Sequence, residues 1–145
     1  MMRNDHFDES TVEQAAKEWL AEIGFHTGYA PVDAAVEDVR DSLGDCILWS
    51  HVANALTRLN PGVDPDLVRS AVARIQRAES QDGMSENQRL YELMVRGVPV
   101  ETTGDDGRPS TVRLQLVDFD TPGNNDWRAL NQFTIIEAGH NRRPD

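Results

Sequence analysis

The sequence lacks several features that would place it in a particular class of protein. Cys46 is its single cysteine among 145 residues, which excludes an internal disulfide and any metal cage built from several cysteines. No apolar run approaches the roughly 18 residues that a membrane span needs. Residues 1–10 also lack the apolar stretch of a secretory signal. These absences predict a cytoplasmic protein with no membrane partner.

Positive charge is scarce as well. The chain has 14 Lys and Arg residues against 25 Asp and Glu residues, a net charge of −11. Residues 1–45 hold eleven acids and three bases, or −8, and residues 46–145 account for the other −3. Neutralisation of phosphates supplies most non-specific affinity for nucleic acid. A nucleic-acid function therefore needs metal ions or basic surface from another polypeptide.

The first two thirds of the chain have helical periodicity. Apolar residues at helical spacing predict helices over residues 10–24, 46–59, 65–78 and 85–97, with another over 32–43. Ser10 with Glu13, and Ser85 with Gln88, fit the S-x-x-E/Q capping box. Asp64 and Pro65 fit an N-cap followed by proline at the first helical position. Cys46, Trp19, Trp49 and Phe133 are expected in the core.

The last third changes character. An extended segment begins at Val98, the glycine-rich stretch 104–109 predicts a turn, and alternating apolar residues predict a strand over 112–116. A loop over 121–126 precedes another predicted strand over 128–137. Helices followed by strands indicate an α+β fold. We expect a single domain over residues 1–145, helical over 8–97 and strand-rich over 98–145.

Seven short segments, in a fixed order, carry a resemblance to a known family: Asp8–Leu20 (DESTVEQAAKEWL), Ala55–Pro61 (ALTRLNP), Asn87–Val100 (NQRLYELMVRGVPV), Leu116–Asp120 (LVDFD), Asn124–Trp127 (NNDW), Asn131–Phe133 (NQF) and His140–Asp145 (HNRRPD). In these segments the chain resembles the N-terminal endonuclease region of the R (restriction and motor) subunit of type I restriction–modification enzymes. The resemblance covers nearly all of the chain from about Asp8, and its specificity comes from the order of the segments.

The resemblance implies a PD-(D/E)xK nuclease, with helices packed on an incomplete restriction-endonuclease-like mixed sheet. Asp145 matches the aspartate of that motif, and its expected role is to bind Mg²⁺. Phosphodiester hydrolysis needs a hard cation held by carboxylates, which polarises the phosphate and lowers the pKa of an attacking water. An incidental chain end is the alternative for Asp145.

Other residues have two interpretations each. Glu13 is a second candidate metal ligand and catalytic residue, because an early-helix glutamate reaches the metal in several such nucleases, yet it also fits the capping box with Ser10. His140, Arg142 and Arg143 are candidate DNA contacts or an ordinary basic turn. Asn131 and Gln132 could help to position the site, or could be ordinary polar residues of a strand.

The sequence departs from the family pattern after Asp145, since it contains neither the strand of the (D/E)xK pair nor a G-x-x-x-x-G-K-[ST] phosphate loop. We therefore expect these 145 residues alone neither to cleave DNA nor to bind and hydrolyse ATP, which the full-length subunit would use.

The complete complex would contain double-stranded DNA and the specificity and methylation subunits. The alternative function is a non-catalytic subunit-interaction module, or the remnant of a truncated restriction gene. An unpaired sheet edge also predicts self-association or marginal stability.

Overall fold

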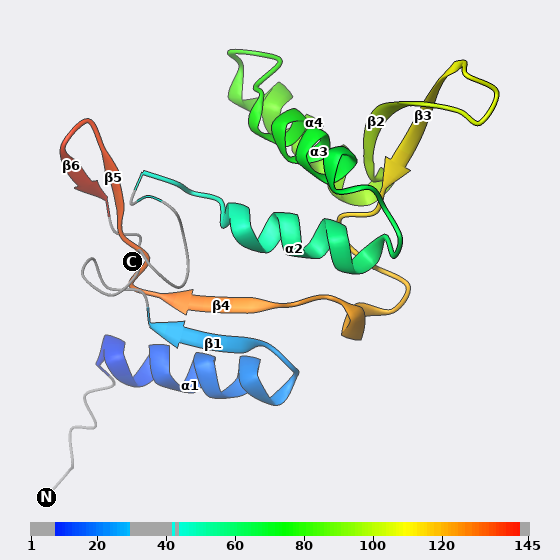
Figure 1. The fold of residues 1–145 in the computed structure, drawn as a ribbon. Helices are drawn as coiled ribbons and strands as arrows, with labels where there is room; N and C mark the ends of the chain where they lie inside the picture. Colours follow the sequence, from blue (N-terminus) through cyan, green and yellow to red (C-terminus); the bar gives the residue numbers. More distant parts are fainter. Residues whose placement is uncertain (1–7, 30–41, 43, 143–145) are drawn as a thin grey trace, which may run out of the picture. The chain divides into compact units, whose positions relative to one another are not determined.

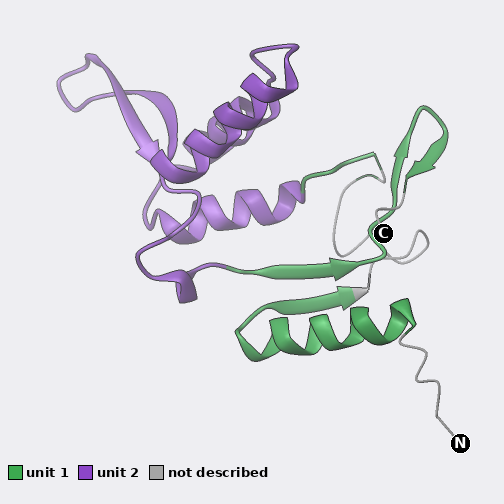
Figure 2. Ribbon diagram, turned by 180° about the vertical axis from the view of Figure 1, so that it is seen from behind, with its two compact units in different colours: residues 1–47, 126–145 green, residues 48–125 purple. Residues whose placement is uncertain are grey.

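The computed structural model describes residues 8–29, 42 and 44–142. The chain divides into two compact units (Figure 2): unit 1 consists of Met1–Ile47 with Asp126–Asp145, and unit 2 of Leu48–Asn125. The helix expected over 32–43 lies almost entirely outside the described residues. That residues 1–145 form a single folding domain stays a prediction.

Unit 1 begins with helix α1, Glu9–Glu22. Its N-cap is Asp8, whose Oδ1 accepts hydrogen bonds from the backbone N–H of Thr11 at 2.9 Å and from its hydroxyl at 2.7 Å. The predicted capping box of Ser10 and Glu13 is therefore wrong. Ser10 lies inside the helix and donates its hydroxyl to Asp8 at 2.8 Å. Asp8, two residues before Ser10, satisfies the free N–H group and leaves Glu13 available for other contacts.

Strand β1, His26–Tyr29, pairs in parallel with β4, Arg128–Asn131. The sequence did not predict β1, which is only four residues long. Figure 1 shows α1 lying along this pair, with its N-terminal end near the carboxyl ends of both strands. Just before the strands, the rings of Phe25 and Trp127 stack at 5.9 Å between centroids. These contacts join segments about 100 residues apart in sequence.

The predicted apolar face of α1 is only partly buried. Val12, Trp19 and Ile23 are 59%, 68% and 72% exposed, so the expectation that Trp19 belongs to the core is wrong. These three residues lie at i, i+7 and i+11, which forms one stripe, whereas Glu13 and Leu20 form a neighbouring stripe and are half-buried. The helix therefore directs a mixed polar and apolar face toward β1 and β4.

The strand predicted over 128–137 is interrupted. β4 ends at Asn131, Gln132 adopts a left-handed conformation (φ 56°), and β5, Ile135–Glu137, begins after it. β5 pairs antiparallel with β6, His140–Arg142. Ala138 and Gly139 form the two-residue turn, both with positive φ (49° and 80°), as tight hairpins require.

Unit 2 contains the apolar core of the described chain. Helices α2 (Trp49–Leu59), α3 (Pro65–Gln76) and α4 (Gly83–Arg96) pack with the antiparallel hairpin of β2 (Val98–Thr103) and β3 (Pro109–Leu114). A short 3-10 helix, Pro122–Asn124, follows. The buried cluster consists of Leu56, Val68, Ala71, Ile75, Leu93, Val98, Val100 and Leu114. The sequence predicted these three helices and both strands.

Capping residues in unit 2 explain where its helices begin and end. Asp82, rather than Ser85, caps α4, because its Oδ2 accepts from the backbone N–H and the hydroxyl of Ser85 at 3.0 and 2.6 Å. Gly97 ends α4 with φ +81°, and a Cβ there would lie 2.9 Å from the carbonyl oxygen of Leu114. Asn60 caps the end of α2 and pairs through its amide with the backbone N–H and carbonyl of Gln115, both at 2.8 Å.

The α+β prediction is confirmed: the described residues form four α-helices and three two-stranded sheets. Cys46 is exposed and precedes α2, so the expectation that it is buried is wrong, whereas Trp49 packs against the core as expected. None of the described helices combines the length and the apolar character that a bilayer crossing requires.

Candidate functional site

Glu13 lies on the second turn of α1, on the side that faces β1 and β4. It is half-buried, whereas its neighbours Val12 and Gln14 are exposed. The capping alternative does not hold, because Asp8 performs that function. The carboxylate of Glu13 therefore has another structural environment, at the carboxyl ends of two parallel strands, where open α/β sheets commonly bind ligands.

Two amides hold the Glu13 carboxylate. Asn131 donates through Nδ2 to Glu13 Oε2 at 3.0 Å, and Gln132 donates through Nε2 to Glu13 Oε1 at 2.8 Å. Each carboxylate oxygen thus accepts one hydrogen bond from a different side chain. An ionised carboxylate offers about four acceptor positions, so each oxygen keeps a lone pair after these bonds form.

Asn131 also carries an unsatisfied group. Its Oδ1 is buried and has no hydrogen-bond partner among the described residues. Buried polar atoms are nearly always paired, so an exception indicates an unobserved water, an ion or a functional role. An uncommitted amide oxygen on the side chain that contacts Glu13 adds a second hard oxygen to this region.

These oxygens fit a magnesium ion in their chemistry, because Mg²⁺ is bound by one or two carboxylates and retains several waters. Within the described ranges, no three His, Cys, Asp or Glu residues cluster as a metal site would require. Asp145 and Arg143 lie outside those ranges. The assignment of Asp145 and Glu13 as metal ligands therefore stays a prediction.

The structure places His140 and Arg142 on β6, where both are exposed. They are two residues apart on a strand, so their side chains share one face of the hairpin. These two basic residues thus lie on a strand rather than in the turn, which consists of Ala138 and Gly139. Their role as DNA contacts stays a prediction.

A second polar cluster fixes the start of the β1–β4 pair. Asp126 accepts from Arg128 through both oxygens, at 3.0 and 2.9 Å, and its Oδ1 lies 2.8 Å from Nδ1 of His26. Hydrogen bonds from Arg128, together with the contact to His26, lower the pKa of Asp126 far below its usual value, despite the opposing effect of burial. This cluster joins the paired residues His26 and Arg128 at the end of the strands away from Glu13.

The loop after β3 is ordered by Asp118. Its carboxylate accepts from the backbone N–H groups of Asp120 and Thr121 at 3.1 and 2.9 Å, and from the amide of Asn124 at 2.9 Å. Bonds from Thr121 and Asn124 lower the pKa of Asp118. Asn125 pairs with the backbone N–H and carbonyl of Asp118. The segments LVDFD and NNDW therefore form one hydrogen-bonded loop, a structural function.

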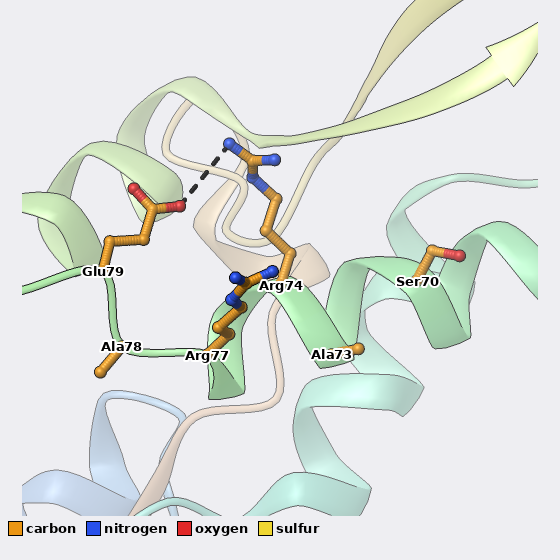
Figure 3. Close-up of a pocket in the computed structure, with 6 residues that line it drawn as sticks. All are labelled: Ser70, Ala73, Arg74, Arg77, Ala78 and Glu79. Atoms are coloured by element: carbon orange, nitrogen blue, oxygen red, sulfur yellow. Dashed lines mark ion pairs between the residues drawn. The ribbon is translucent and has the colours of Figure 1, made fainter.

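Figure 3 shows a hollow in unit 2, of about 620 Å³, at the end of α3. Ser70, Arg74, Arg77 and Glu79 contribute its polar groups, and Arg74 reaches Glu79 at 3.8 Å. It is an open surface with one paired arginine and one acid, unlike the carboxylate site that phosphodiester hydrolysis requires.

Sequence reasoning found Glu13, Asn131 and Gln132 separately and missed their direct contact. It also missed the cluster of His26, Asp126 and Arg128. Both contacts depend on the pairing of residues 26–29 with 128–131. Strands this short leave no recognisable pattern in the sequence. The left-handed backbone of Gln132 could not be predicted from its residue type, since that conformation usually selects glycine or asparagine.

Comparisons with known proteins give a consistent result. The family model described as the type I restriction enzyme R protein N terminus (HSDR_N) matches residues 6–145. The HindI type I restriction enzyme endonuclease subunit of Haemophilus influenzae is 30% identical over 142 residues. A protein of Methanocaldococcus jannaschii, named as a type I restriction enzyme MjaIXP endonuclease subunit, is 26% identical over 141 residues.

Each alignment covers 95% of this chain, and the chain spans 13% of the length of each of these relatives. No solved structure matches the chain significantly. The family match extends from before α1 through β6 and includes every residue of the Glu13 cluster. The chain belongs to the family of type I restriction enzyme R protein N-terminal regions.

Proposed function

We propose that this chain contributes to magnesium-dependent cleavage of double-stranded DNA, as the N-terminal part of the R subunit in an ATP-dependent type I restriction complex. The observation that carries the proposal is the family match over residues 6–145. The restriction endonuclease subunits named above support the nuclease assignment. The half-buried carboxylate at the ends of β1 and β4 supports a metal-dependent reaction.

In this proposal Glu13 and Asp145 bind Mg²⁺, which would lower the pKa of the attacking water and stabilise charge on the phosphate. His140, Arg142 and Arg143 contact the DNA backbone. The acid and lysine of the (D/E)xK pair complete the site, and ATP acts in other domains of the complete polypeptide. The specificity and methylation subunits are its partners, and the complex is cytoplasmic.

Replacement of Glu13 by Gln in the complete R subunit, assembled with its partner subunits, tests this function. Glutamine keeps the size of the side chain and removes the charge that would bind the cation. We expect DNA cleavage to fall by at least about tenfold, by analogy with losses at metal sites, while ATP hydrolysis is unchanged. The matched control is Glu18→Gln on the same helix, whose carboxylate accepts from Gln14 at 2.8 Å on the exposed side.

Wild-type cleavage by the Glu13→Gln subunit would remove Glu13 from the site. Asp145→Asn in the same assembled complex tests the second ligand, with the same expected loss of cleavage and the same ATPase control.

A second function is favoured by one observation: Trp19 and Ile23 on α1 are 68% and 72% exposed. Large apolar side chains at this exposure favour contact with another protein surface. In the interaction-module alternative, α1 docks on other subunits or on a second copy of the chain. Trp19→Ser in the complete R subunit would then reduce co-purification with the methylation and specificity subunits, or self-association in sedimentation of the chain. If Trp19→Ser changes neither the co-purification nor the self-association, this role is excluded.

A further inference from the structure

We infer that Asn131 and Gln132 are positioning residues, which together form an amide clamp that orients the Glu13 carboxylate for cation binding. The inference rests on the proposed function, because it assumes that Glu13 binds the metal. It adds two residues that neither contact DNA nor bind the cation through their donor atoms. Their effect is exerted through Glu13.

The donor geometry fixes the carboxylate plane. One amide N–H group reaches Oε2 at 3.0 Å and the other reaches Oε1 at 2.8 Å. A carboxylate held at a single oxygen can rotate about its terminal torsion, which is broad for glutamate. Contacts at both oxygens, from two different side chains, remove that rotation and leave one lone pair on each oxygen.

The backbone conformation at Gln132 makes the double contact feasible. Consecutive residues of a strand point to opposite faces, so Asn131 and Gln132 could not both reach Glu13 from a regular strand. β4 ends at Asn131, and Gln132 takes the left-handed conformation with φ 56°. Such a conformation is strained for a residue with a Cβ and persists where the surroundings require it. The strained residue donates to Glu13.

The clamp is also held from the strand side. Asn131 is the last paired residue of β4, in register with Tyr29 at the end of β1. The pairing of β1 with β4 therefore sets the position of one donor, and the packing of α1 against both strands sets the position of the acceptor. The buried, unpaired Oδ1 of Asn131 leaves an oxygen acceptor in the same place.

The first experiment measures the clamp without metal or DNA. Side-chain amide signals of the 145-residue chain are recorded by NMR, with proton exchange rates for Asn131 and Gln132. We expect both NH₂ groups to shift and to exchange faster in Glu13→Gln, because the charged acceptor is lost, and to remain unchanged in the control Glu18→Gln. If the shifts and exchange rates of both amides are the same in Glu13→Gln as in wild type, the amide clamp does not exist.

The second experiment uses the complete R subunit in its assembled complex and varies the Mg²⁺ concentration. We expect Asn131→Ala and Gln132→Ala to raise the Mg²⁺ concentration for half-maximal cleavage by about 10- to 100-fold. The rate at saturating Mg²⁺ is largely restored, because Glu13 itself is intact. Gln14→Ala is the control, since it removes an amide-to-carboxylate bond from the same helix without contacting Glu13.

The outcomes separate the two proposals. An unchanged Mg²⁺ requirement in both alanine variants, or a loss of rate that saturating Mg²⁺ does not restore, would overturn the positioning role even if Glu13→Gln is inactive. Wild-type cleavage by Glu13→Gln would instead overturn the metal-binding function, whatever the amide signals show. If the variants only lower the melting temperature, the two amides have a structural role.

Discussion

The two units differ in what they bury. All eight buried apolar side chains of the described residues belong to unit 2, whereas in the described part of unit 1 the fully buried side chain is that of Thr134, 1% exposed. The described part of unit 1 relies on a ring stack, an ion-pair cluster and hydrogen bonds to Glu13. Unit 2 is thus stabilised by apolar packing, and the described part of unit 1 is organised around polar groups.

The largest expected effect is the loss of a core side chain from unit 2. Leu56 is 0% exposed, so Leu56→Ala should lower the free energy of unfolding by about 3 kcal/mol, through lost burial and the cavity that remains. The matched change in unit 1 is Leu130→Ala, where the side chain is half-buried in β4. We expect about 1 kcal/mol there, because only part of the side chain leaves contact.

Chemical denaturation of the two variants beside wild type measures this difference, with the exposed Val95→Ala as a control for helix substitution. Equal losses for Leu56→Ala and Leu130→Ala would show that unit 1 has apolar packing as tight as that of unit 2.

The same contrast explains which elements could be predicted from sequence. α2, α3, α4 and the β2–β3 hairpin follow their apolar periodicity because their apolar residues meet one another in a shared core. In α1 the same periodicity identified the buried face only in part, since Leu20 is half-buried but Val12, Trp19 and Ile23 are exposed, and the polar Glu13 is half-buried as well. Periodicity indicates a helix, but it does not identify what the helix packs against.

The capping residues and the short strands were predicted less well. Ser10 and Ser85 fit a capping motif, but an aspartate two or three residues earlier forms the cap in each case. Both residue types accept from a free N–H group, so local sequence does not separate them. β1 and the break at Gln132 depend on pairing and contacts across about 100 residues, which no local pattern contains.

A smaller effect, with a distinct pH dependence, is expected at the cluster of Asp126 in unit 1. Hydrogen bonds from Arg128 and the contact to His26 lower the pKa of Asp126 in the folded state. A carboxylate with a lowered folded pKa contributes stability that is fully present above its unfolded pKa, near 3.9, and is lost as pH falls toward the folded value. Asp126→Asn should therefore cost about 1 kcal/mol at neutral pH.

The measurement is the free energy of unfolding of Asp126→Asn and wild type between pH 7 and pH 2. The two curves should run parallel above about pH 5. They should converge as the pH falls below 4, because Asp126 is then protonated in the unfolded state of wild type, which removes the advantage of the charged carboxylate in the folded state. A difference that stays constant over the whole range would mean that the charge of Asp126 contributes nothing.

The smallest change in the free energy of unfolding is expected for Gln132→Gly. This substitution should nevertheless change the Mg²⁺ requirement for cleavage. Glycine removes the left-handed strain at φ 56°, but it also removes the hydrogen bond to Glu13 and gives the unfolded chain more freedom. Strain relief of about 1–2 kcal/mol opposes a bond worth about 1 kcal/mol and an entropic cost of similar size. The free energy of unfolding should therefore stay within about 1 kcal/mol of wild type.

The Mg²⁺ requirement of the assembled complex should nevertheless rise as much in Gln132→Gly as in Gln132→Ala, since both lack the amide. The pair separates backbone strain from the donor: alanine keeps the strain and glycine removes it. If Gln132→Gly were clearly more stable than wild type and cleaved DNA at the wild-type Mg²⁺ concentration, the strained backbone at Gln132 would have no connection with the site. If both variants need more Mg²⁺ while only Gln132→Ala is destabilised, the strain is maintained for the amide, and the polar organisation of unit 1 serves Glu13.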